Sequence, residues 1–135
     1  MAHETRIPFN GVIVTDPVLR WTTGDKPRPV LSFLVASDST RYNPRAGERG
    51  QWEKHRSTSL FVSLWRNPEA AERILSKGVA VVIYGELWTE TIETQTGDGR
   101  TETEYRTRLI ADHIGPDLTA STQATQALIE RITAN

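Results

Sequence analysis

The residues of this sequence with the clearest chemical potential are basic and aromatic side chains that lie close together between positions 41 and 66. Four of the ten aromatic residues fall there. The basic residues outnumber Glu48 and Glu53 and give the segment a local charge of +4. Basic side chains neutralise phosphates, and flat rings stack on exposed bases without reading their identity, so the pattern favours binding of a single-stranded nucleic acid. The residues concerned are Arg41, Tyr42, Arg45, Arg49, Trp52, Lys54, Arg56, Phe61, Trp65 and Arg66.

A second interpretation of these residues is open from composition alone. Phe61 and Trp65 could point into a hydrophobic core, while the charges only keep a loop soluble. The segment from Glu86 to Glu104 carries six acids against Arg100, a local charge of −5, and is the part least suited to contact phosphate. The formal net charge of −1 therefore results from two oppositely charged segments that nearly cancel.

Signals for an enzyme are poor. His3, His55 and His113 are far apart in sequence and match no recognised metal-ligand spacing. The chain has no glycine-rich phosphate loop, no GxSxG motif and no cysteine, which excludes thiol nucleophiles and cysteine-ligated zinc. The acids of the 86–104 segment are explained by a solvated strand face. We therefore expect no catalysis and no metal.

The elements that must position the basic and aromatic residues are mainly strands. Residues 7–14, 30–37 and 79–88 are apolar runs, and residues 58–65 alternate, with Leu60, Val62 and Leu64 facing a core and Phe61 and Trp65 facing away. Residues 89–95 and 101–114 flank an Asp-Gly sequence typical of a hairpin. Residues 40–56 lack apolar periodicity and predict a functional loop or a long hairpin.

One helix is predicted in this chain, after the third strand. Asn67 is the expected N-cap, Pro68 suits the first helical position, and Gly78 supplies the stop. Three strands, one helix and two or more strands favour an all-β OB-fold, a five-stranded Greek-key barrel with its helix between strands 3 and 4.

The chain of 135 residues is long enough for one domain, expected at residues 1–118. Residues 119–135 are small and polar and predict a C-terminal tail that is mostly disordered, apart from a short helix around Leu128, Ile129 and Ile132. No apolar run has the length of a signal peptide or a membrane span, so we expect a cytoplasmic protein with no membrane partner.

Four blocks of the sequence, in this order around the helix, resemble the bacterial single-stranded-DNA-binding protein family, over residues 7–118 and in its actinobacterial branch. They are residues 11–20 (GVIVTDPVLR), 34–39 (LVASDS), 77–87 (KGVAVVIYGEL) and 114–118 (IGPDL). The resemblance implies an OB-fold, a homotetramer, no cofactor, and sequence-independent binding of single-stranded DNA in replication, repair or recombination, with the protein in the cytoplasm at the nucleoid.

The family's stacking positions are only partly matched here. The aromatic at the end of its third strand falls on Trp65, whereas the other three fall on Thr40, Ser59 and Ile92. The nearby aromatics that could replace them are Tyr42, Phe61, Trp88 and Trp52.

The family's acidic C-terminal tip, which recruits partner proteins, has no counterpart in the last residues of this sequence. We therefore expect a divergent paralogue without that recruitment, or a truncated chain. Because the acidic 86–104 segment offsets the basic 41–66 segment, we expect DNA binding that is weaker and more sensitive to salt than is usual in the family. The alternative is an OB-fold module that oligomerises or binds proteins, with weak or no DNA binding.

Overall fold

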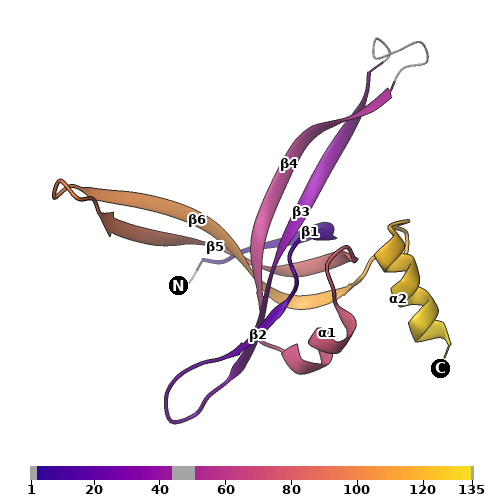
Figure 1. Cartoon of the computed structure of the whole chain (residues 1–135), viewed down its shortest axis with the longest axis horizontal. Helices are drawn as coiled ribbons and strands as arrows, with labels where there is room; N and C mark the ends of the chain where they lie inside the picture. Colours follow the sequence, from indigo (N-terminus) through magenta and orange to yellow (C-terminus); the bar gives the residue numbers. More distant parts are fainter. Residues whose placement is uncertain (1–2, 44–50, 135) are drawn as a thin grey trace.

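The fold is a closed β-barrel with two projecting hairpins and two helices (Figure 1). The computed structural model describes residues 3–43 and 51–134, with only the backbone for 40–43 and 51–55. Its elements are β1 (Thr5–Ile13), β2 (Val18–Trp21), β3 (Pro29–Asn43), β4 (Gln51–Leu64), α1 (Pro68–Ile74), β5 (Ala80–Gln95), β6 (Thr101–Pro116) and α2 (Gln123–Thr133). The strand order is β1-β5-β6-β4-β3-β2, and an additional pairing of β1 with β3 closes the sheet. The predicted all-β OB-fold is confirmed.

The helix α1 lies between β4 and β5, and not between the third and fourth strands as predicted. The strand count differs because the short strand β2 has no recognisable pattern in the sequence. Both β1 and β2 pair with β3, and they act as two halves of one strand interrupted before Pro17. Across the interruption, Val14 donates to the carbonyl of Leu34 and Leu34 donates to the hydroxyl of Thr15. Counting β1 and β2 as one strand restores the predicted five.

The core follows the alternation predicted for β4. Leu60, Val62 and Leu64 are buried, whereas Phe61 between them remains 37% exposed. The interpretation that Phe61 points into the core is therefore wrong. The other strands contribute fully buried aliphatic and aromatic side chains, including Ile13, Leu31, Phe33, Val35, Ile83 and Leu109.

Two glycines permit neighbouring strands of the barrel to approach closely. A Cβ on Gly11 would lie 2.4 Å from the carbonyl oxygen of Ala36 on β3. A Cβ on Gly85 would lie 2.0 Å from the carbonyl oxygen of Ile110, beside a shift in the register of β5 and β6. Both distances exclude any larger residue without movement of the backbone.

Two long hairpins extend from the barrel, one formed by β3 and β4 and the other by β5 and β6 (Figure 1). The irregular segment predicted at 40–56 therefore belongs largely to a long hairpin, whose polar strands need no core alternation because they project beyond it. The predicted Asp-Gly hairpin is confirmed: Thr96 donates to the carbonyl of Arg100, and Gly99 has a φ of 84°.

The helix α1 begins where the sequence predicts, after Asn67 and at Pro68. Asn67 has a left-handed conformation (φ 47°) and makes no side-chain capping bond, so it differs from the predicted N-cap. The helix ends at Ile74, before Gly78. Among the described residues, no helix has the length and apolar character needed to cross a membrane.

The segment predicted as a mostly disordered tail contains the eleven-residue helix α2. Its Leu128 is 3% exposed and belongs to the core cluster. Thr125 is fully buried, and its hydroxyl accepts a hydrogen bond from the backbone N–H of Ala80 at 2.7 Å. Arg131 donates to the carbonyl of Ile74 at 3.2 Å, so α2 contacts both α1 and the start of β5.

Candidate nucleic-acid interface

A row of four side chains crosses the outer face of the barrel on neighbouring strands. Leu34 on β3 pairs with Phe61 on β4, Phe61 pairs with Arg108 on β6, and Arg108 pairs with Trp88 on β5. Directly paired residues point to the same side of a sheet. Because Leu60 and its counterparts on the other strands are buried, this side faces outward. Phe61 and Trp88 are 37% and 40% exposed.

Phe61 and Arg108 are in direct contact. The guanidinium carbon of Arg108 lies 4.7 Å from the centre of the Phe61 ring, within cation–π range. The two side chains line a shallow pocket of about 360 Å³ together with Leu34, Ser59, Arg106 and Thr107. An exposed ring beside an arginine can stack on a base while the arginine binds the adjoining phosphate.

Trp65 lies one residue beyond β4 on the same outer side as Phe61, and it also carries an arginine. The guanidinium carbon of Arg28 lies 5.2 Å from the centre of its ring. Arg28 is held by the turn between β2 and β3, where its backbone N–H donates to the Thr22 hydroxyl at 2.9 Å and its carbonyl accepts from Thr22 at 2.9 Å. The outer side of β4 therefore presents two rings, each covered by an arginine from another element.

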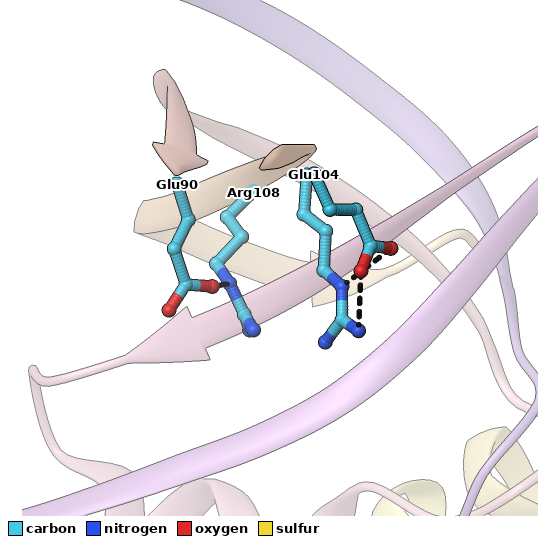
Figure 2. Close-up of polar contacts among 4 residues, drawn as sticks. Glu90, Glu104 and Arg108 are labelled. Carbon is cyan, nitrogen blue, oxygen red and sulfur yellow. Dashed lines mark hydrogen bonds and ion pairs between the residues drawn. The ribbon is translucent and has the colours of Figure 1, made fainter. Parts of the chain in front are cut away.

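The arginines of β6 are paired with carboxylates (Figure 2). Arg108 donates to Glu90 of β5. Arg106 donates twice to Glu104, at 3.0 and 3.1 Å. This hydrogen bonding, and then the charge of Arg106, lower the pKa of Glu104, and the same contacts raise the pKa of Arg106. The Arg106–Glu104 pair stays ionised near neutral pH, and a phosphate that approaches either arginine must compete with a carboxylate already bound to it.

The other predicted basic residues do not join the row. Arg56 is exposed on β4, five positions from Phe61, and strand alternation turns it to the opposite side. Arg66 lines a separate pocket of about 400 Å³ between α1 and the end of β6. Arg45 lies outside the described residues, as do the side chains of Arg41 and Lys54 and of the aromatics Tyr42 and Trp52.

Sequence reasoning missed three arginines of this face: Arg28, Arg106 and Arg108. The signal for two of them was present, because Arg106 and Arg108 alternate with Leu109 and its inward-facing neighbours. The acidic segment was counted only to Glu104, which left these two arginines out. The position of Arg28 over Trp65 depends on a tertiary contact that leaves no local pattern.

The structure does not gather the histidines and acids into a metal centre. In the part of the chain that the structure describes, no three histidine, aspartate or glutamate side chains are placed to hold one ion. His3 and His113 are exposed, and the side chain of His55 lies outside the described residues.

A comparison with protein families identifies the chain. The model of the single-strand binding protein family matches residues 5–117. The chain belongs to this family. The chain is similar to the single-stranded DNA-binding protein of Mycobacterium leprae. The two are 34% identical over 125 residues, which cover 90% of this chain and 68% of the relative. The protein of the same name from Corynebacterium glutamicum is 36% identical over 119 residues, 86% of this chain and 48% of the relative. The chain thus spans about half to two thirds of the length of these family members.

Solved structures of single-stranded DNA-binding proteins share the fold. The crystal structure of the small single-stranded DNA-binding protein from Streptomyces coelicolor has a TM-score of 0.67 and 24% sequence identity, covering 87% of this chain and 97% of that protein. The Plasmodium falciparum SSB complex with ssDNA has a TM-score of 0.61 at 14% identity, covering 87% and 99% of the two chains. At these identities the likeness shows the family's fold alone.

Proposed function

We propose that this protein binds single-stranded DNA independently of sequence, on the outer face of β3, β4, β6 and β5. The observation that carries the proposal is the row in which Arg108 lies between the exposed rings of Phe61 and Trp88. Rings spaced along a groove stack on bases of any identity, and the arginine between them binds the backbone. Membership of the single-strand binding protein family supports the same function.

Within this proposal the residues divide into two roles. Phe61, Trp65 and Trp88 stack on bases, and Tyr42 and Trp52, which pair in the backbone register of the β3–β4 hairpin, add further rings along it. Arg108 binds phosphate within the row, and further basic residues neutralise phosphates outside the row, along that hairpin and at its base. They are Arg41, Arg45, Lys54, Arg56 and Arg66.

We propose further that residues 1–118 are the DNA-binding domain and that the protein acts as a homo-oligomer, as a tetramer, without catalytic activity. Exposed apolar side chains on β1 and β5 support association: Pro8 pairs with Tyr84, and Val82 lies two positions before Tyr84 on the same side of β5. The family's function supports a role in replication, repair or recombination, in the cytoplasm at the nucleoid.

A titration of the full chain with fluorescently labelled poly(dT) tests the DNA-binding proposal. We expect a rise in anisotropy at about 50 mM salt and a steep loss of affinity at about 200 mM, since each neutralised phosphate releases counterion. Poly(dC) should bind comparably and duplex DNA much more weakly. Light scattering on the same samples gives the mass of the assembly. Absence of binding to poly(dT) at the lower salt concentration would refute the proposal.

A further inference from the structure

Arg108 is held between two different partners on the proposed DNA-binding face. One side of its guanidinium lies over the Phe61 ring, at 4.7 Å from the ring centre. Its Nε donates to the Glu90 carboxylate (Figure 2). Glu90 comes from β5, two positions beyond Trp88, the residue that pairs directly with Arg108. The arginine at the centre of the row is therefore already engaged by an anion of the protein itself.

This pair differs from the neighbouring one between Arg106 and Glu104. The side chains of Arg108 and Glu90 are 21% and 34% exposed, whereas those of Arg106 and Glu104 are 51% and 59% exposed. Glu104 lies two residues from Arg106 on the same strand, but Glu90 reaches Arg108 from another strand. The pair of Arg108 and Glu90 is thus the less exposed to solvent, and its arginine lies within the row of four side chains.

We propose that Glu90 occupies the place of a DNA phosphate on Arg108 and so restrains single-stranded DNA binding on this face. The inference rests on the proposed function, in which Arg108 binds phosphate, and adds Glu90 as the internal competitor for that contact. Carboxylate and phosphate oxygens accept the same charge-assisted bonds from a guanidinium. A DNA strand that stacks on Phe61 and Trp88 runs its backbone past Arg108, and phosphate displaces Glu90 when it binds there.

Displacement is feasible because the pair remains partly exposed to solvent. With 21% of the Arg108 side chain and 34% of the Glu90 side chain exposed, water and salt reach the pair and weaken it. When Glu90 is displaced, Arg108 also becomes free to leave the Phe61 ring, which opens that ring to a base. One carboxylate therefore restrains both a phosphate contact and a stacking surface.

The test compares Glu90→Gln with Glu93→Gln by anisotropy titration with poly(dT). Glutamine keeps the shape of Glu90 and removes its charge, and we expect affinity at about 50 mM salt to rise about two- to fivefold. The slope of log affinity against log salt should become more negative by about 0.7, because the phosphate on Arg108 then releases its counterion and no displaced carboxylate takes one up. Glu93 is an exposed residue of β5 that strand alternation turns to the opposite side. Glu93→Gln removes the same charge and should change affinity less.

A double-mutant cycle with Arg108→Gln separates the specific contact from a general change in charge. In the Arg108→Gln protein, Glu90→Gln should gain no more affinity than Glu93→Gln does. The proposal is overturned if Glu90→Gln and Glu93→Gln bind alike, or if the gain from Glu90→Gln persists without Arg108. Failure of the wild-type protein to bind poly(dT) at all is a separate result, which overturns the proposed function together with this inference.

Discussion

The hydroxyl of Thr125 is expected to be a major contribution of α2 to the stability of the barrel. Thr125→Val keeps the shape of the side chain and removes its oxygen. The N–H of Ala80, which donates to that oxygen at 2.7 Å, then has no acceptor, and Ala80 is only 4% exposed. An unsatisfied buried N–H costs about 1–3 kcal/mol. Thr122 loses its 2.5 Å contact with Thr125 but still donates to the carbonyl of Gly78. We therefore expect a loss of about 2 kcal/mol.

Urea unfolding followed by tryptophan fluorescence, at one fixed protein concentration, measures this loss. For a domain of this size it corresponds to a fall in melting temperature of roughly 6–10 °C. Thr133→Val is the matched control, since Thr133 is an exposed residue of the same helix, and it should change stability by no more than about 0.5 kcal/mol. Thr125→Ser keeps the hydroxyl and should be milder than Thr125→Val. A Thr125→Val protein as stable as the control, or more stable than Thr125→Ser, would contradict the assigned hydrogen bond.

Three further outcomes are expected. Phe61→Leu should weaken poly(dT) binding in an anisotropy titration by about 5- to 150-fold, the equivalent of one stacking contact, whereas Tyr105→Leu on the opposite side of β6 should leave it nearly unchanged. Gly85→Ala should lower the free energy of unfolding by about 3 kcal/mol or more, because the new Cβ would lie 2.0 Å from a carbonyl oxygen of β6; a variant as stable as the wild type in thermal melts would contradict this packing. The folded-state pKa of Glu104 is depressed, so the stability that its pair with Arg106 provides is present above the ordinary pKa of glutamate and is lost as the pH falls through the lowered value. An NMR titration of the carboxyl carbons measures this shift, which Arg106→Gln should abolish.

Much of the barrel could be predicted because its strongest signals are local. Alternation on β4 separates Leu60 and Val62 from Phe61, and the Asp-Gly sequence marks the hairpin of β5 and β6. The four-residue strand β2 is too short for a periodic pattern. The packing of α2 on the barrel could not be predicted, because the fully buried Thr125 is a polar residue whose partner is a backbone group 45 positions away.

The candidate site was only partly accessible to sequence reasoning. Phe61 and Trp88 could be chosen as exposed aromatics, and Trp65 follows from the family resemblance. Their common register depends on the parallel pairing of β4 with β6, which no local pattern reveals. Alternation with Leu109 could have placed Arg108 on the outer side of β6, but its neighbours along the chain do not show that it lies over Phe61. Local charge counts find basic segments, but strand alternation decides which charges share a face.

The spacing between neighbouring strands of the barrel affects the geometry of bound DNA. Phe61 on β4 and Trp88 on β5 are separated by β6, so their backbones lie two strand spacings apart, about 10 Å. Successive bases along one strand of a duplex lie only about 3.4 Å apart. Two successive bases that stack one on each ring are therefore drawn apart, and a continuous base stack must open to place them there. The spacing of β-strands thereby sets the spacing of bases, and an increase in ultraviolet absorbance as the bound DNA unstacks is its optical signature.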